Sequence, residues 1–378
     1  MRFAVIRSSS CLVRTWLLPA ILAAGVLAAC NFPGKDGQTV SGRGLWIANG
    51  TNVVEYNPAQ LNSGATPPHV SINSAVFGTP QGVVFDRDGN LWVLDPAGLV
   101  NGIATPALFK FSAAQLAALR TDNAPDPVAT ITSTLLSTPQ QGVFDVSGNV
   151  WITDHNTNTV LVFTGLQLAQ TGTNKFAPVV AMTSPQFSGP SGIAFNSSGD
   201  LWIANNGIAA SAAQAFGGGT TIVELTAASL PAVAPSGTAT PSVPADVTLS
   251  DEAKASIQSP WGLAFDSAGN LWSSNSATST LVKFARADLM TGAPVPAVTL
   301  SSTKVNNTPS LNQPHGLCMD DVGNVAAINE AGGSDAAGIA FYGVGQLATG
   351  SPAPGTFIAG KGTMLNEPEG CAFGPVVP

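Results

Sequence analysis

The residues best suited to chemistry in this chain of 378 residues are a histidine and a glutamate at matching places in two copies of one motif. His315 lies between Pro and Gly in Pro-His-Gly, and Glu369 lies between Pro and Gly in Pro-Glu-Gly. A histidine beside a carboxylate can act as a general base or help to bind a cation. The alternative is a hydrogen-bonded polar pair that lines a solvated channel, and the residue types leave both interpretations open.

A bound metal ion would need more ligands than this pair supplies. Asp95 and Asp154 each end an apolar segment and offer carboxylate oxygens, and Gln81 offers an amide oxygen. If the chain has a cofactor, we expect a divalent cation (Ca²⁺, Mg²⁺ or Zn²⁺) on Glu369, His315, Asp95 and Asp154. The alternative for the two aspartates is structural, because Asp commonly bonds nearby backbone groups at turns.

The motif that contains these residues is complete five times and begins a sixth time. The complete copies start at Pro80, Pro139, Pro190, Pro260 and Pro314. The sixth copy, from Pro368, stops after its first apolar run, and its missing continuation stands near the other end of the chain from Gly44. One unit is therefore divided between the two ends, as in a closed ring.

The elements that must position the site are short β-strands. Each copy holds two apolar runs joined by a turn such as Asp86-Arg87-Asp88-Gly89-Asn90. The runs are apolar on both faces, as a sheet packed between two neighbours requires. The sequence thus predicts an all-β, six-bladed β-propeller closed by the C-terminal strand, which joins the N-terminal blade.

The residue between Pro and Gly should lie at the rim of the central channel in every blade. We expect ligand contacts from four residues in this set: Gln81, Gln140, Ser191 and Trp261. Trp261 would be the first aromatic contact, although its ring could instead pack on the neighbouring blade. The loops after the second strands are rich in small residues and should surround the same face.

The phrase Pro-x-Gly-(Val/Ile/Leu)-x-Phe-Asp-x-x-Gly-Asn-(Leu/Val)-Trp resembles the NHL repeat and related gluconolactonase and streptogramin-lyase propellers, over Gly44 to Pro378. The gluconolactonase likeness implies a metal ligand at Glu369, but Ser191 and Trp261 replace the Asn and Asp of that family. The streptogramin-lyase likeness implies a catalytic role for His315. In that family a supporting Glu ends the second strand, whereas here Asn329 takes the place and Glu330 follows one residue later. Such propellers include enzymes, sensors and binding scaffolds.

The N-terminus predicts export. Three arginines, an apolar run and Leu-Ala-Ala-Cys resemble a bacterial lipoprotein signal, with cleavage before Cys30 and lipidation of that cysteine. We therefore expect a signal peptide at 1–29, the lipidated cysteine and a flexible tether at 30–42, and the propeller at 43–378. Asn31 after the cysteine favours the outer membrane, facing the periplasm or the cell surface.

The other two cysteines of the mature chain, Cys318 and Cys371, fall in the first strands of adjacent blades. Their positions in the motif differ by one residue, so their side chains leave opposite faces of their sheets. They either face each other across the seam or face away from each other. A disulfide is one prediction, and two small buried residues are the other.

The composition limits the partners. A net charge of −8, with only 10% charged residues, argues against nucleic acid and against electrostatic docking on anionic lipid. We expect a monomer that contacts the membrane only through its N-terminal lipid. The predicted function is a binding scaffold for a protein, peptide or glycan on the face that carries the loops. The alternative is a metal-dependent hydrolase or lyase with its site at the channel mouth.

Overall fold

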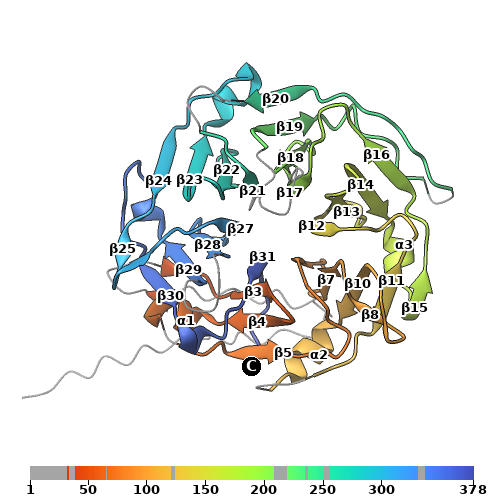
Figure 1. Ribbon diagram of the computed structural model, residues 1–378, viewed down its shortest axis with the longest axis horizontal. Helices are drawn as coiled ribbons and strands as arrows, with labels where there is room; N and C mark the ends of the chain where they lie inside the picture. Colours follow the sequence, from red (N-terminus) through yellow and green to blue (C-terminus); the bar gives the residue numbers. More distant parts are fainter. Residues whose placement is uncertain are drawn as a thin grey trace, which may run out of the picture.

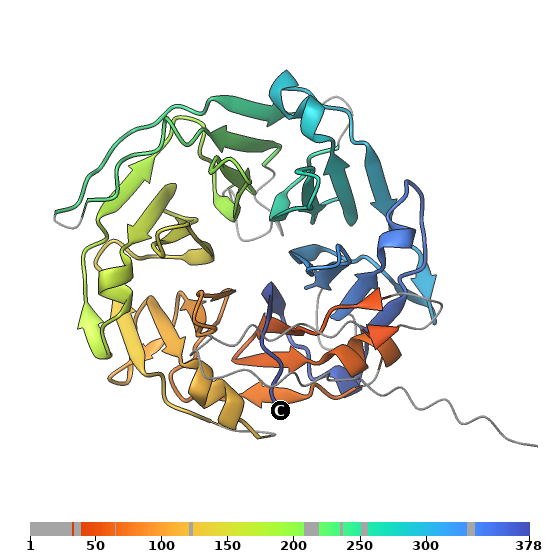
Figure 2. The ribbon, with the colours of Figure 1, turned by 180° about the vertical axis from the view of Figure 1, so that it is seen from behind.

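The computed structural model shows a ring of six β-sheets around a central channel (Figures 1 and 2). It describes residues 32–33, 39–64, 66–120, 124–207, 219–234, 237–250, 256–330 and 337–378. The predicted signal peptide, Cys30 and part of the predicted tether lie outside the described residues. β1 (Phe32–Pro33) and β2 (Thr39–Val40) form a short antiparallel ladder. Within these ranges no helix has the length and apolarity needed to cross a membrane.

Blades 2 to 6 are antiparallel sheets whose first strand lies at the channel. From the channel outward, the strands of blade 2 are β6 (Gly82–Phe85), β7 (Leu91–Asp95), β10 (Ala107–Phe111) and β11 (Ala129–Thr132), and those of blade 3 are β12 (Pro139–Phe144), β13 (Val150–Asp154), β14 (Thr159–Phe163) and β16 (Val180–Thr183). Blade 4 has β17 (Pro190–Phe195), β18 (Leu201–Asn205), β19 (Thr221–Leu225) and β20 (Val247–Ser250). Blade 5 has β21 (Pro260–Phe265), β22 (Leu271–Asn275), β23 (Thr280–Phe284) and β24 (Val298–Ser301), and blade 6 has β27 (Pro314–Met319), β28 (Val325–Asn329), β29 (Gly338–Tyr342) and β30 (Thr356–Ala359). The prediction of a six-bladed propeller is confirmed.

Blade 1 combines both ends of the chain. Its strands are β31 (Pro368–Gly374), β3 (Gly44–Asn49), β4 (Asn52–Tyr56) and β5 (Val70–Ile72), in that order outward. β31 runs antiparallel to β3, with Gly374 opposite Gly44 and Pro368 opposite Asn49. The C-terminal strand therefore closes the ring, as the divided motif predicts.

Segments between the third and fourth strands reach back to the preceding blade. The short helices there are α1 (Pro58–Ser63), α2 (Ala113–Ala118), α3 (Gly165–Leu168), η2 (Arg286–Thr291) and η3 (Val344–Gln346). β15 (Gly172–Lys175), from blade 3, pairs in parallel with β11 of blade 2. Parallel bridges likewise join Ala239 of blade 4 to Val180, and Gly350 of blade 6 to Leu300. The remaining elements are the ladders β8 (Leu99–Val100) with β9 (Ile103–Ala104) and β25 (Lys304–Val305) with β26 (Thr308–Pro309), and η4 (Lys361–Thr363).

The core consists of six apolar clusters, one in each seam between neighbouring blades. The motif tryptophans of the second strands lie in or beside these clusters. The turn aspartate explains the rest of the motif: Asp86 accepts the backbone N–H of Asn90 at 2.9 Å and the indole N–H of Trp92 at 3.0 Å. The same carboxylate thus fixes the turn and the large ring beside it.

The motif glycine lets neighbouring blades approach closely. A Cβ on Gly192 would lie 2.1 Å from the carbonyl oxygen of Trp261 in the next blade. Blade 3 differs, because its register places Gln141 where the other blades have this glycine, and Gly142 stands one position later. A Cβ on Gly142 would meet nothing nearer than 3.5 Å, which is ordinary contact.

Replacing Gly192 by alanine should therefore destabilise the protein by about 1–3 kcal/mol, the usual effect of overpacking a tight site. Gly142→Ala is the matched control, and it should be neutral or slightly stabilising because it adds a methyl group without a clash. Urea unfolding of the parent and both variants measures the difference. Equal midpoints for the two variants would contradict this explanation of the motif.

Blade 1 holds an unusual buried carboxyl group. Glu55, in β4, is fully buried, and neither of its carboxylate oxygens has a hydrogen-bond partner among the described residues. Its space exists because Gly44, on the adjacent strand, has no side chain. Burial raises the pKa of Glu55 from its ordinary value of 4.5 to about 8, so the group is mostly protonated at neutral pH.

This pKa predicts a specific dependence of stability on pH. Between about pH 4.5 and 8 the unfolded chain releases a proton that folded Glu55 keeps, so the free energy of unfolding falls as the pH rises through this range. Glu55→Gln does not ionise and should lack this fall. Between pH 5 and pH 8.5 the free energy of unfolding of the parent should therefore fall by up to about 4 kcal/mol more than that of the variant. Thermal unfolding of both proteins across this range measures the effect, and parallel curves would refute it.

Candidate functional site

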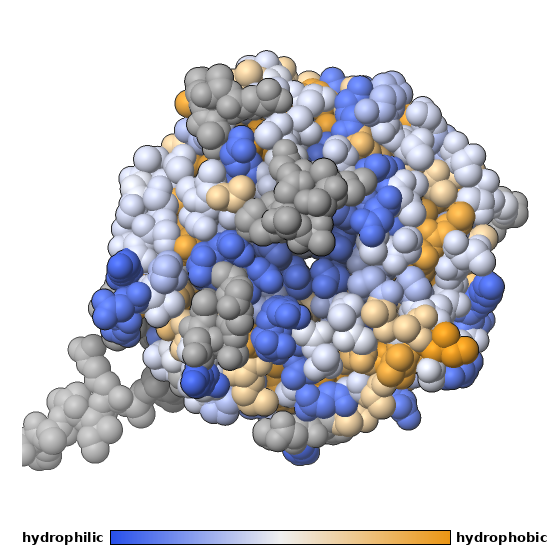
Figure 3. Space-filling view, viewed as in Figure 1, coloured by the Kyte–Doolittle hydropathy of each residue, from blue (hydrophilic) through white to orange (hydrophobic). Residues whose placement is uncertain are grey.

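The candidate site is the channel mouth on the face that carries the loops after the second strands. The first strand of a blade starts opposite the end of the second, as Pro190 pairs with Asn205. Both predicted rings of residues, one between Pro and Gly and one at the ends of the second strands, therefore lie at the same end of the channel. Figure 3 shows this face, on which hydrophilic residues border much of the channel opening.

The ring at the ends of the second strands serves the backbone. Asp95 is fully buried and accepts N–H bonds from Gly78, Thr79 and Ala97. Burial raises the pKa of Asp95, and these three hydrogen bonds work against that shift. Asp154 is also buried and accepts the N–H groups of the loop that precedes β12. Asn side chains at this position accept equivalent backbone N–H bonds in the other four blades. Of the two interpretations that the sequence left open for Asp95 and Asp154, metal binding or a structural role, the structure therefore supports the structural role.

The four predicted metal ligands are consequently not gathered into one site. Within the described ranges, no group of three or more His, Cys, Asp or Glu side chains is arranged to hold a metal ion. The carboxylates of Asp95 and Asp154 are already bonded to backbone N–H groups, so this donor set does not fit a divalent cation.

His315 and Glu369, in contrast, do meet. Nδ1 of His315, in β27, lies 2.7 Å from Oε2 of Glu369, in β31. The side chain of His315 is only 8% exposed, and that of Glu369 is 12% exposed. Because β27 belongs to blade 6 and β31 to blade 1, this bond spans the seam at which the ring closes.

The surroundings favour a charged imidazole. Burial by itself would lower the pKa of His315, but the charge of Glu369, its hydrogen bond and then the charge of Glu330 outweigh burial and raise it. Glu330 directly follows β28 and acts on His315 through its charge. Burial raises the pKa of Glu330, which His315 partly offsets.

Trp261 completes this cluster from blade 5. Its ring stacks on the imidazole of His315, with centroids 4.0 Å apart and planes within 9°. A protonated imidazole is stabilised by the electron-rich face of an indole. Trp261 is half-buried, so part of its surface remains at the mouth. Nε2 of His315 is buried and has no hydrogen-bond partner among the described residues.

The opposite wall carries amides. β12 lies across the channel from β27 (Figure 1), and it supplies Gln140 and Gln141, with Gln81 preceding the neighbouring β6. All three side chains are half-buried, and within the part of the chain described no hydrogen bond from their amides is recorded. Ser191 differs, since it is buried and its hydroxyl donates to the carbonyl of Pro260 at 3.1 Å.

Sequence reasoning missed Gln141. The available signal was its position: aligned on the motif proline, Gln141 stands where the other copies have glycine. The other two histidines do not join this cluster: His155 follows β13 in blade 3, and His69 precedes β5 in blade 1. His155 contacts the carbonyl of Gly207 through Nε2, and His69 contacts the carbonyl of Val377.

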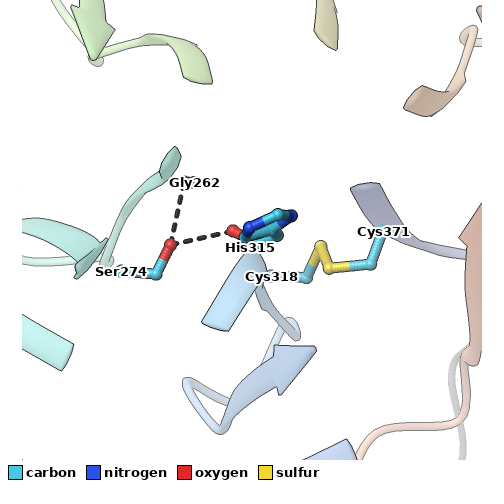
Figure 4. The surroundings of a disulfide bond; sticks show 5 residues. All are labelled: Gly262, Ser274, His315, Cys318 and Cys371. Carbon is cyan, nitrogen blue, oxygen red and sulfur yellow. Dashed lines mark hydrogen bonds between the residues drawn. A yellow bond between two sulfur atoms is a disulfide. The ribbon is translucent and has the colours of Figure 1, made fainter. Parts of the chain in front are cut away.

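Below the mouth, the first strands enclose a cavity of about 190 Å³. Cys318 and Cys371 line it and are joined by a disulfide, with Cα atoms 6.0 Å apart (Figure 4). Of the two orientations that the sequence leaves open, the cysteines thus face each other across the seam. Figure 4 also shows how blade 5 supports β27: Ser274 accepts the N–H of Gly262 and donates to the carbonyl of His315, each at 2.8 Å.

Comparison with known proteins establishes the fold. No protein-family model and no curated protein matches the chain. Among solved structures, a chain of the nidogen/laminin complex is similar at 13% identity and a TM-score of 0.56, over 88% of this chain and 98% of that one. A 6-phosphogluconolactonase-like protein from Bacteroides fragilis has 13% identity and a TM-score of 0.48, over 88% and 98%. A streptogramin B lyase has 15% identity and a TM-score of 0.42, over 70% of this chain and 66% of the lyase. At these identities the likeness is one of fold.

Proposed function

We propose that the propeller is a ligand-binding module whose contact surface is the channel mouth. The observation that carries this proposal is a set of half-buried side chains at the starts of the innermost strands: Trp261 in β21, Gln140 in β12, and Gln81 just before β6. An aromatic ring offers apolar contact area, and amides offer donors and acceptors. Sites for small ligands combine these features in a concave surface.

The chemistry of the rim suits an uncharged, hydrogen-bonding ligand. Amide side chains match both peptide groups and sugar hydroxyls, so the ligand is a protein, a peptide or a glycan. The cavity of about 190 Å³ below the mouth is smaller than common ligand pockets of roughly 300–1,000 Å³, and only an end or a loop of the ligand would enter it. The chain of the nidogen/laminin complex offers a precedent for this architecture within a protein assembly.

The proposed location follows from the N-terminal sequence. A lipid on Cys30 and a tether to residue 42 would hold the module at the membrane surface outside the cytoplasm, as a monomer. A tether of this kind leaves the channel mouth free to meet ligands in the envelope. The lipid would then be the only contact with the membrane.

Removal of the aromatic ring tests the binding proposal. Glycan and peptide arrays probed with the purified protein should yield bound compounds, and Trp261→Ala should weaken their binding by about tenfold or more, as at binding hot spots. Leu166→Ala, at a side chain 72% exposed on α3, is the control and should bind like the parent. Binding that survives Trp261→Ala in a folded variant, or arrays without any bound compound, would reject the mouth as the binding surface.

A second candidate function rests on the contact between His315 and Glu369. Glu369 engages Nδ1, which leaves Nε2 of His315 without a partner among the described residues. A carboxylate that orients an imidazole in this way is the arrangement of a general base, a role that His315 would take once it has lost the proton that Glu369 favours. The reaction would be hydrolysis or elimination on a cyclic ester, with His315 as the base. The divalent cation expected for this class is not part of the proposal, because its predicted donors are bonded elsewhere.

This second candidate predicts a large effect of one substitution. If His315 is the base, the purified protein should open lactone substrates, and His315→Gln should lower kcat by about 10²–10⁴-fold. His155→Gln is the matched control and should leave kcat unchanged, since the ring of that histidine bonds Asn156 and Gly207 in blades 3 and 4, away from His315. Lactone hydrolysis that is equal in the parent and in His315→Gln would remove the catalytic role.

A further inference from the structure

We propose that the Cys318–Cys371 disulfide is a redox-sensitive positioning element of the channel mouth. It holds β31 against β27 so that Glu369 reaches His315, and its reduction releases that contact. His315, on which Trp261 stacks, then loses its bond to Glu369, the carboxylate that favours the charged imidazole. The consequence for ligand binding rests on the function proposed above, whereas the structural coupling does not.

The two bonds join the same pair of strands. His315 and Cys318 both lie in β27, and Glu369 and Cys371 both lie in β31. These strands belong to different sheets and are not neighbours in any strand ladder. Their separation at the mouth is therefore set by side-chain bonds and by packing, and the covalent bond is the strongest of these.

Two of the other seams are joined by a hydroxyl group of the second strand. Between blades 3 and 4 the hydroxyl of Thr153 donates to the carbonyl of Ser191 at 2.6 Å. Between blades 5 and 6 Ser274 makes the equivalent bond to the carbonyl of His315. At the seam between blades 6 and 1 the corresponding residue is Ile328, which has no hydroxyl group. Ala48, Leu94 and Ala204 occupy this place in blades 1, 2 and 4, so the hydroxyl bridge joins two of the six seams and the disulfide joins a third.

The disulfide is open to a small reductant through the channel. Both cysteines line the central cavity, and Cys371 is half-buried whereas Cys318 is 9% exposed. A thiolate of a dithiol would attack Sγ of Cys371 and release Cys318 as a thiolate. The second thiol of the reagent would then close on the first, releasing Cys371. Two electrons and two protons pass to the cysteines, and the reagent leaves as a cyclic disulfide.

Release of this contact has a predictable electrostatic result. The charged groups that act on His315 are Glu369 from β31 and Glu330 after β28, and Glu367, just before β31, acts on Glu330; Trp261 from β21 carries no charge. Burial lowers the pKa of His315 and Glu369 is the main group that raises it. When Glu369 moves away, burial prevails and the pKa of His315 falls.

The test is an NMR titration of the histidine rings in the purified protein, which contains only three histidines. In the oxidised parent the pKa of His315 should lie above its ordinary value. In the parent reduced with dithiothreitol, and in Cys318→Ser/Cys371→Ser, the proton affinity of His315 should fall by about tenfold, at the lower end of the effect of a neighbouring opposite charge. His155 lies in blade 3, away from this seam, and its ring signals at a fixed pH should not move, which also verifies that the fold persists.

Two variants separate positioning from general loosening of the ring. Glu369→Gln should lower the pKa of His315 in the oxidised protein and make it insensitive to dithiothreitol. Thr153→Ala removes the hydroxyl bridge of another seam and should leave the pKa of His315 unchanged. An unchanged pKa of His315 after complete reduction, verified by thiol counting, would overturn the proposal.

The titration needs no ligand, so it separates this inference from the proposed function. If a ligand is found on the arrays, reduction should weaken its binding in the parent but not further in Glu369→Gln. A redox-dependent pKa without any bound ligand would support the coupling and count against the proposed function. Ligand binding together with a pKa of His315 that is unchanged by reduction would support the proposed function and overturn the coupling.

Discussion

The structure depends on the pairing of its last strand, β31, with β3, the first strand of the propeller in the sequence. β31 supplies the inner strand of blade 1, and Phe373 packs with Leu45 and Ile47 in the cluster between blades 6 and 1. This pairing has the largest sequence separation in the fold, so it carries a high cost in loop-closure entropy. The disulfide partly offsets that cost. By closing a loop of 53 residues it reduces the entropy of the unfolded chain, a contribution of about 4 kcal/mol.

The repeated motif and the candidate site use different residues of the same strands. Where the copies agree, the side chains serve folding: the turn aspartate bonds its own turn and, in blades 2 and 3, the tryptophan, and the glycine admits the next blade. The copies differ in the residue after the motif proline, and this position lies at the mouth, although the side chain of Ser191 is buried there. His315, Trp261 and Glu369 come from three successive blades and form one contact cluster there.

Much of the architecture could be predicted from the sequence, because a pattern repeated in every blade fixes strand order and ring closure together. The meeting of His315 with Glu369 was also accessible, since both occupy the same place in adjacent blades. The stacking of Trp261 on His315 could not be predicted from the sequence, because the direction of a side chain at the rim depends on its neighbours. The alternation of side chains along a strand allowed two orientations for Cys318 and Cys371. Which of the two occurs depends on how the two strands are oriented in space, which the sequence pattern does not give. The lipid anchor at Cys30 stays a prediction.

The segments that reach back to the preceding blade give the ring a direction. β15 covers the outer strand of blade 2, and similar contacts join blades 4 to 3, 5 to 4 and 6 to 5. During synthesis from the N-terminus, each of blades 2 to 5 thus has its outer hydrogen-bonding edge covered only when the next blade emerges. Blade 1 must wait with an open inner edge until β31 is made. A chain that stops before residue 368 would expose that edge permanently, and unpaired edges invite association with other chains.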